Sequence, residues 1–288
     1  MSDRSATVAS ALTWARGILA EAGIPWPEVD SALLLGHVLD LGRGEIATKE
    51  LVGSTIAPDA EAAFRDLVAR RATREPLQHI TGLAPFRSLL LHVGPGVFVP
   101  RPETEAVAQI AIDALRARAE EAPIAVDLGT GSGALALSLA VEVPQAHVYA
   151  VELSPEAAVW TERNIASTGA RVDLTVGDLA EALSELDGTV SVVVSNPPYI
   201  PLGMVPRDPE VRLFDPRLAL YGGDDGLDVV RSLSRRALRL LIPGGTLVIE
   251  HGEQQGQAIR ELLRADGWHA TATHPDLTLR DRATTALR

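Results

Sequence analysis

Apolar and polar residues in the first quarter of the chain alternate with the period of amphipathic helices. In the segment 8–22, apolar side chains recur at helical spacing, and Gly23 follows as a helix-ending glycine. Pro27 and Pro58 each stand before another such stretch, in the position where proline opens a helix. Because no strand-like pattern interrupts this part, we expect a small helical bundle over residues 1–75.

The second half of the chain alternates between short apolar runs and amphipathic segments. The apolar runs predict strands at Ile124–Leu128, His147–Val151, Val172–Val176, Val190–Ser195 and Thr246–Glu250. The segments between them predict helices near residues 132–143, 155–168 and 225–241. Such alternation indicates a mostly parallel, Rossmann-like sheet of the α/β class. Two tail runs, Trp268–His274 and Arg282–Leu287, predict a closing antiparallel hairpin that completes a sheet of seven strands.

Residues 76–100 differ from both flanking parts. Two short runs there, Gln78–Gly82 and Leu89–Val93, have the composition of strands and flank Pro85. We expect them to pair as a β-hairpin that links the helical part to a second domain over residues 101–288.

The composition narrows the possible partners and locations. The chain has 288 residues, of which 46% are hydrophobic, and a formal net charge of −12. This acidity disfavours stable nucleic-acid binding, which needs clustered Lys and Arg. There is no cysteine, and the seven histidines lack ligand spacing, so we expect no metal. The N-terminus lacks the apolar core of a signal peptide and no run has membrane-spanning length, so we expect a cytoplasmic protein without membrane contact.

The most informative motif directly follows the predicted strand Val190–Ser195 and reads Asn196-Pro197-Pro198-Tyr199. Neither proline can donate to a strand ladder, and each restricts the residue before it, so the turn is stiff. Open α/β sheets bind ligands at this edge. The Asn196 side-chain oxygen and the Pro197 carbonyl can accept from a planar –NH2 group, with the Tyr199 ring against its face. In isolation, such a motif can also simply terminate a strand.

A glycine loop follows the first predicted strand and opens a helix. Its residues are Gly129, Thr130, Gly131, Ser132 and Gly133. Glycines let a ligand approach backbone N–H groups at a helix N-terminus. The spacing fits both a nicotinamide dinucleotide and S-adenosylmethionine, and Glu152 at the end of the second strand can bind the ribose hydroxyls of either.

Acidic residues at the strand ends favour S-adenosylmethionine. Asp127, just before the glycine loop, would repel a pyrophosphate but can help to organise a zwitterionic methionine. Asp178 follows the third strand, where a carboxylate can accept from the adenine amine. With Glu152, these acids predict a cofactor site on one edge of the sheet.

Together these motifs resemble the PrmC/HemK family, the protein-(glutamine-N5) methyltransferases that modify peptide chain release factors. The resemblance covers nearly the whole chain. It is carried by Ile80-Thr81-Gly82, FVPRPETE at 98–105, DLGTGSG at 127–133, SNPPYI at 195–200, DGL at 225–227, PGG at 243–245 and Asp281-Arg282. DLGTGSG and NPPY are shared with many amino-methyltransferases, whereas PRPETE together with SNPPYI is much more specific.

The resemblance implies a class I methyltransferase fold with S-adenosylmethionine as the cofactor. It implies that the target is the glutamine in the Gly-Gly-Gln loop of release factors 1 and 2, and that the helical part recognises this partner. Asn196 and the Pro197 carbonyl would hold the glutamine amide, while Pro198 and Tyr199 shape the slot. The implied cofactor-site residues are Gly129, Thr130, Gly131, Ser132, Gly133, Glu152, Asp178, Leu179 and Asn196.

Four positions depart from the family pattern. Glu152 stands where many relatives carry Asp, and Leu179 stands where some carry an aromatic that covers the adenine. His251 replaces a small apolar residue, and Leu279 replaces a glycine. None of them belongs to the turn at 196–199.

Other charged residues support weaker hypotheses. Arg101 and Glu103 either gate the cofactor or steer the release-factor loop, or they form a salt-bridged brace between the domains. Glu250 and Glu253 are close in sequence, but we assign them no catalytic role. A run of arginines on one predicted helix could meet an acidic partner, but we expect it to face solvent. It comprises Arg65, Arg70, Arg71 and Arg74.

Two rival functions fit part of the pattern. A methyltransferase for an exocyclic amine of adenine or guanine in DNA or RNA can use the same turn, but it needs a basic surface and stacking aromatics. Aromatic residues make up only 4% of this chain. A catalytically silent cofactor-binding module is a weaker alternative because it has no use for a substrate-shaped turn, and a nicotinamide reductase is the weakest.

Overall fold

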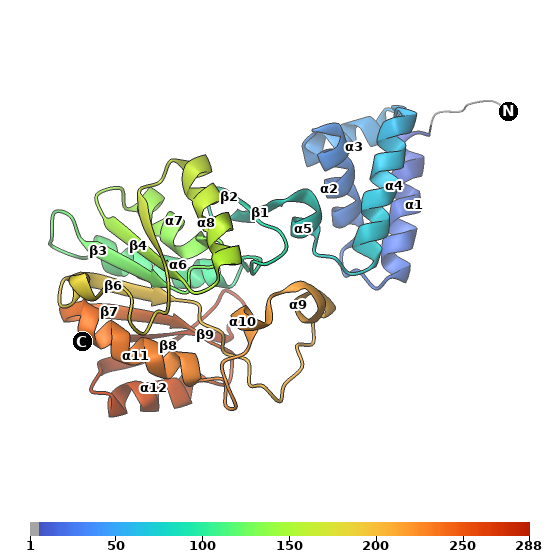
Figure 1. Ribbon diagram of the computed structural model, residues 1–288. Helices are drawn as coiled ribbons and strands as arrows, with labels where there is room; N and C mark the ends of the chain where they lie inside the picture. Colours follow the sequence, from blue (N-terminus) through green and yellow to red (C-terminus); the bar gives the residue numbers. More distant parts are fainter. Residues whose placement is uncertain (1–5) are drawn as a thin grey trace. The chain divides into compact units, whose positions relative to one another are not determined.

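The computed structural model describes residues 6–288 (Figure 1). Contacts divide the chain into two compact units. Unit 1 comprises the residues up to Gly82 together with Pro206–Phe214, and unit 2 comprises Leu83–Val205 and Asp215–Arg288. The chain therefore leaves unit 2 shortly after the Asn196–Tyr199 turn, adds one short segment to unit 1, and returns.

Unit 1 is a helical bundle. Its helices are α1 (Val8–Glu21), α2 (Pro27–Leu39), α3 (Arg43–Leu51), α4 (Pro58–Ala72), α5 (Leu77–Thr81) and, from the later segment, α9 (Pro209–Phe214). Thr7 caps α1 by accepting from the N–H of Ser10 at 3.1 Å, and prolines open α2 and α4 as predicted. The apolar helix faces meet in a core around Leu12, Phe64 and Val68.

Two local features of the sequence prediction are wrong. Gln78–Gly82 was predicted as a strand, but Leu77–Thr81 forms helix α5, because Pro76 starts a helical turn that buries Ile80. The hairpin instead pairs β1 (Leu83–Phe86) with β2 (Leu89–His92). Helix α3 was not predicted, because its single buried residue, Ile46, gives no apolar period.

Unit 2 contains a seven-stranded sheet in the order β5-β4-β3-β6-β7-β9-β8. The strands are β3 (Ile124–Leu128), β4 (His147–Glu152), β5 (Val172–Val176), β6 (Val190–Ser195), β7 (Leu241–Glu250), β8 (His269–Pro275) and β9 (Asp281–Leu287). The first five are parallel, and β9 is antiparallel to both β7 and β8. The predicted Rossmann-like sheet with a C-terminal antiparallel hairpin is confirmed.

Helices cover both faces of this sheet (Figure 1). They are α6 (Thr104–Arg116), α7 (Ala134–Glu142) and α8 (Pro155–Thr168) on one face, and α11 (Asp228–Leu240) and α12 (Gly256–Ala265) on the other, with a short α10 (Arg217–Leu220). In β6, Val192 and Val194 face one apolar core and Val193 faces the other, as a central strand requires. In the described part of the chain, no helix combines the length and apolarity that a membrane crossing needs.

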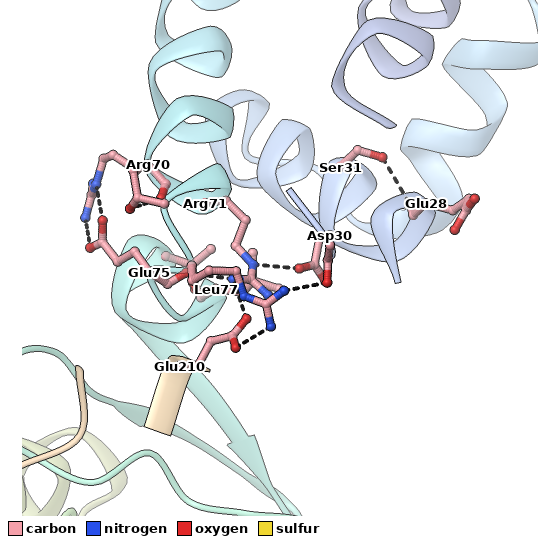
Figure 2. Close-up of polar contacts among 12 residues, drawn as sticks. Glu28, Asp30, Ser31, Arg70, Arg71, Glu75, Leu77 and Glu210 are labelled. Carbon is pink, nitrogen blue, oxygen red and sulfur yellow. Dashed lines mark hydrogen bonds and ion pairs between the residues drawn. The ribbon is translucent and has the colours of Figure 1, made fainter. Parts of the chain in front are cut away.

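A buried ion cluster joins α2, α4 and α9 within unit 1 (Figure 2). Arg71 pairs through Nε with Asp30 Oδ2 at 2.8 Å and through Nη1 with Glu210 Oε1 at 2.9 Å. Arg74 Nη2 reaches Glu210 Oε2 at 2.6 Å. The expectation that these arginines face solvent holds for Arg65 and Arg70, whose side chains are each 47% exposed. It is wrong for Arg71, which is buried between two acids, and for Arg74, whose side chain is 17% exposed and pairs with Glu210.

Candidate active site

The turn Asn196–Tyr199 lies at the carboxyl edge of the sheet, directly after β6. Ser195 donates its hydroxyl to the Leu128 carbonyl at 2.5 Å, which ties the end of β6 to the end of β3. Asn196 donates from Nδ2 to Thr104 Oγ1 at 3.3 Å. The turn therefore adjoins the start of the glycine loop, and one end of the Asn196 amide is already engaged.

A second loop containing glycines supports this turn. A Cβ on Gly222 would lie 2.4 Å from the Pro198 carbonyl oxygen, and a Cβ on Gly226 would lie 2.3 Å from that of Tyr199. Gln255 Nε2 donates to the same Tyr199 oxygen at 2.9 Å. Any side chain at either glycine would displace the turn, which gives the DGL motif at 225–227 a physical reason.

The glycine loop joins β3 to α7 in a conformation suited to glycine. Gly129, Gly131 and Gly133 have φ values of 81°, 59° and 86°, in the left-handed region that other residues avoid. A Cβ built on Gly129 or Gly131 would meet no heavy atom within 4 Å. The space beside these two glycines is therefore available to a ligand. Ser132 is buried, and its carbonyl accepts from Asn164 Nδ2 at 2.9 Å.

Glu152, the last residue of β4, holds the glycine loop in place. Its Oε2 accepts from the N–H of Gly131 at 2.7 Å, and its Oε1 accepts from the N–H of Ser154 at 2.8 Å. Each carboxylate oxygen keeps a further lone pair. Glu152 thus orders the loop and can still accept from another donor, a supporting role that the sequence did not indicate.

Asp127 is fully buried beneath the glycine loop. Its Oδ2 accepts from the Thr130 hydroxyl at 2.6 Å and from the N–H of Ala136 at 3.1 Å. Its Oδ1 has no hydrogen-bond partner within residues 6–288. Burial raises the pKa of Asp127 to about 7, against the two hydrogen bonds that favour its charged form, and the charge of Glu152 adds to the rise. A cationic ligand at the loop would favour the ionised state.

The end of β5 lies next to the end of β4, because Gly177 donates its N–H to the Glu152 carbonyl at 2.8 Å. Asp178 is exposed there, and its Oδ1 accepts from the N–H of Ala180 at 2.9 Å. Leu179 is half-buried and packs against the core beneath α11. The predicted acids thus come together at one edge of the sheet, with Asp178 open to solvent.

Glu250 was assigned no role from the sequence, yet it lies beside Asn196. Ser195 and Ile249 are register partners, so Asn196 and Glu250 follow on adjacent parallel strands. Glu250 is 2% exposed, and burial raises its pKa to about 7 although Thr104 opposes the rise. The sequence did contain a signal for this role, because Glu250 is an acid at the end of the predicted strand Thr246–Glu250. Glu253 is exposed, in keeping with the absence of an assigned role.

Three other residues that the sequence singled out, Arg101, His251 and Leu279, have contacts or backbone conformations that serve the fold. Arg101 Nη2 pairs with Asp215 Oδ2 at 2.6 Å, and both residues belong to unit 2, so this ion pair is not the brace between domains that was one hypothesis. His251 Nε2 contacts Thr284 Oγ1 at 2.9 Å within the core. Leu279 has a φ of 64°, which explains why glycine is common there. The residues described here include no cluster of three or more side chains suited to a metal ion.

Comparison with known proteins places the chain in a family. Residues 10–82 match the PrmC N-terminal domain, and residues 89–204 match the methyltransferase small domain. A release factor glutamine methyltransferase from Streptomyces coelicolor is 52% identical over 272 residues, which cover 93% of each chain. A 4-amino-L-phenylalanine/4-methylamino-L-phenylalanine methyltransferase from Streptomyces pristinaespiralis is 42% identical over 294 residues, covering 100% of this chain and 97% of that one.

A solved structure supports the fold. The 16S rRNA N2 methyltransferase RsmC from T. thermophilus, in complex with AdoMet and guanosine, superposes with a TM-score of 0.53 at 22% identity, covering 72% of this chain and 49% of that one. This likeness shows a methyltransferase fold. Since high sequence identity extends through both the helical part and the sheet, the chain belongs to the PrmC family of release factor glutamine methyltransferases.

Proposed function

We propose that this protein transfers a methyl group from S-adenosylmethionine to the side-chain amide nitrogen of the glutamine in the Gly-Gly-Gln loop of peptide chain release factors 1 and 2. The observation that carries the proposal is the supported turn Asn196–Tyr199 beside the glycine loop, in a chain that is 52% identical to a release factor glutamine methyltransferase. A turn that offers two acceptors in one plane suits a carboxamide, which presents two N–H hydrogens.

The residues around the glycine loop fit the cofactor. Open space beside Gly129 and Gly131 admits it, and the unpartnered Oδ1 of Asp127 suits its amino group. Glu152 has lone pairs for the ribose hydroxyls, and Asp178 can accept from the adenine amine. When bound, S-adenosylmethionine supplies an electrophilic methyl group on a sulfonium. The other residues that we assign to this site are Thr130, Ser132, Gly133, Leu179 and Asn196.

Alignment is the main task of the protein, because a carboxamide nitrogen is a poor nucleophile whose lone pair is delocalised. Asn196 Oδ1 and the Pro197 carbonyl accept its two hydrogens and hold the nitrogen in place. Such positioning lowers a barrier by roughly 7–11 kcal/mol at the extreme. Burial raises the pKa of Tyr199 to about 12, so a neutral ring, together with Pro198, shapes the slot. The proton of the methylated amide leaves to water.

We assign recognition of the release factor to the helical unit 1, and we place the reaction in the cytoplasm, where translation occurs. A net charge of −12 opposes stable binding of nucleic acid. The decisive experiment offers isotopically labelled methyl donor with release factor, duplex DNA, ribosomal RNA and 4-aminophenylalanine in parallel. Label on the loop glutamine, located by peptide mass spectrometry, is the expected result. Label in nucleic acid or in the free amino acid alone would contradict the proposal.

Replacing Asn196 separates catalysis from cofactor binding. We expect Asn196→Ala to lower kcat by about 100- to 1000-fold, as the loss of one preorganised polar contact does in other active sites. The Kd for S-adenosylmethionine, measured by calorimetry, should stay within about threefold of the unmodified protein. Equal losses in both quantities would mean that Asn196 serves only the cofactor.

A further inference from the structure

Three side chains from three elements of unit 2 converge beside the transfer site. Asn196 follows β6 and Glu250 ends β7, side by side at the same edge of the sheet. Thr104 opens α6, and its Oγ1 accepts from Asn196 Nδ2 at 3.3 Å. Thr104 and Glu250 are both buried, at 3% and 2% exposure. This group lies on the protein side of Asn196, away from solvent.

The Glu250 carboxylate is only partly satisfied. Its interactions with the side chains of Thr104 and Asn196 favour the charged form, but Oε2 lacks a hydrogen-bond partner among the residues that the structure describes. Arg282 is nearby, yet its ion pair is with Asp276, at 3.4 Å. The charged or titratable groups that face Glu250 are Glu103 at the start of α6, Tyr199 after β6 and Arg282 on β9.

The ionised state of Glu250 determines which groups donate and which accept in this cluster. An ionised carboxylate can only accept, whereas a threonine hydroxyl can donate once and also accept. With Glu250 ionised, Thr104 donates toward the carboxylate and accepts from Asn196. The –NH2 end of the Asn196 amide is then drawn inward, and Oδ1 is left for a substrate.

We propose that Glu250 is a positioning residue that acts with Thr104 to fix the Asn196 side-chain amide with its oxygen toward the substrate. The inference rests on the proposed function, because the orientation of this amide matters for a substrate that donates hydrogens. A protonated Glu250 carries a donor and no longer enforces the direction. Since burial raises the pKa of Glu250 to about 7, the constraint is lost as the pH falls through neutrality.

The chain allows a direct test without any substrate, because it contains only two asparagines, Asn164 and Asn196. Selective nitrogen-15 labelling of asparagine gives one side-chain –NH2 signal set for each. Asn164 is the internal control, since its Nδ2 donates at 2.9 Å to the backbone carbonyls of His92 and Ser132. Burial lowers the pKa of the His92 imidazole, so any shift that it causes at Asn164 comes at lower pH and is the same in Glu250→Gln. We expect the Asn196 signals to shift with a midpoint near pH 7 and to be flat in Glu250→Gln, while the Asn164 signals do not depend on Glu250. Asn196 signals that are flat from about pH 5.5 to 8.5 in the unmodified protein would overturn the proposal.

Kinetics give the second readout. Glu250→Gln and Thr104→Val should each lower kcat for the release factor by about 10- to 100-fold, by analogy with the loss found when groups that orient metal ligands are removed. The Kd for S-adenosylmethionine should change little, and Thr104→Ser should restore most of the activity. The matched control is Glu253→Gln, at an exposed acid three positions away.

The outcomes separate the two proposals. If the unmodified enzyme leaves the release factor unlabelled, the proposed function is contradicted. The pH titration of the asparagine signals still tests the role of Glu250 in that case, because it needs no substrate. A Glu250→Gln variant that keeps both the kcat and the pH profile of the unmodified enzyme overturns the positioning role. If Glu250→Gln does not fold, the same criterion applies to Thr104→Val. Threonine and valine have nearly equal volumes, so this change removes the hydroxyl with little effect on packing.

Discussion

Buried carboxylates in the ion cluster of unit 1 and those at the sheet edge of unit 2 have opposite electrostatic surroundings. In unit 1, burial alone would raise the pKa of Glu210, yet its interaction with the Asp208 side chain and its hydrogen bonds with Arg74 and Arg71 outweigh burial and lower the pKa to about 2. In unit 2, Asp127 and Glu250 each retain an unpartnered oxygen in the described structure, and burial raises the pKa of both to about 7. The buried carboxylate of the ion cluster is therefore kept ionised, whereas those at the sheet edge change their protonation state near neutral pH.

This difference distinguishes a structural acid from a functional one. A buried acid that is fully paired stabilises one arrangement of the chain and has no capacity left for a ligand. A buried acid without a cation costs stability, and a ligand or a neighbouring donor can recover that cost. Among the buried acids discussed here, Asp127, Glu152 and Glu250 have no ion pair within residues 6–288, and all three lie at the carboxyl edge of the sheet. Only Asp127 and Glu250 of these three also have an unpartnered oxygen in the described structure.

The largest expected effect comes from breaking the paired cluster. Arg71→Met leaves Asp30 without its cation and removes one of the two arginines on Glu210. We expect a loss of about 3–5 kcal/mol in the free energy of unfolding of unit 1, measured by denaturant titration. The matched control is Arg70→Met, one position away, whose exposed pair with Glu75 is worth about 1 kcal/mol or less. Similar losses in both variants would remove the contrast between buried and exposed pairs.

The pH dependence of Glu210 gives the next effect. Its folded pKa of about 2 lies below the ordinary 4.5, so its stabilising contribution is present above the ordinary value and is lost as the pH falls toward 2. At 1.36 kcal/mol per pKa unit, this amounts to at most roughly 3 kcal/mol, of which the interaction with Asp208 supplies a part. Glu210→Gln should therefore lower stability at pH 7 and have little effect near pH 2. An equal destabilisation at both pH values would show that ionic pairing is not the cause.

Replacing Asp127 should change the stability by less than replacing Glu210, and in the opposite direction. Its folded pKa of about 7 lies above the ordinary 3.8, so the ionised side chain costs stability increasingly as the pH rises between these values. Asp127→Asn keeps an acceptor for Thr130 and should stabilise the cofactor-free protein by about 1–2 kcal/mol at pH 8, with no gain near pH 4. Thermal unfolding at the two pH values measures this difference. A variant that is less stable at pH 8 would place Asp127 with Glu210 as a structural acid.

The sequence predicted those features that depend on local pattern. The strands from β3 to β6 are found within one residue of the predicted bounds, because β-branched apolar runs between turns leave few alternatives. The predicted glycine loop and turn also lie at one sheet edge. What could not be predicted depends on contacts between distant residues. Arg71 finds Glu210 far along the chain, and Glu250 reaches Asn196 through the register of two strands.

The excursion of Pro206–Phe214 into the helical unit limits how this protein can be dissected or recombined. A truncation that begins at Leu83 would keep Glu210 but delete both of the arginines that pair with it, so this carboxylate would lose its counter-ions. Likewise, a chimera that takes the helical bundle from a relative must also take the segment that corresponds to Pro206–Phe214. Each unit is therefore assembled from two separate stretches of the sequence, so neither can be cut out as one continuous piece.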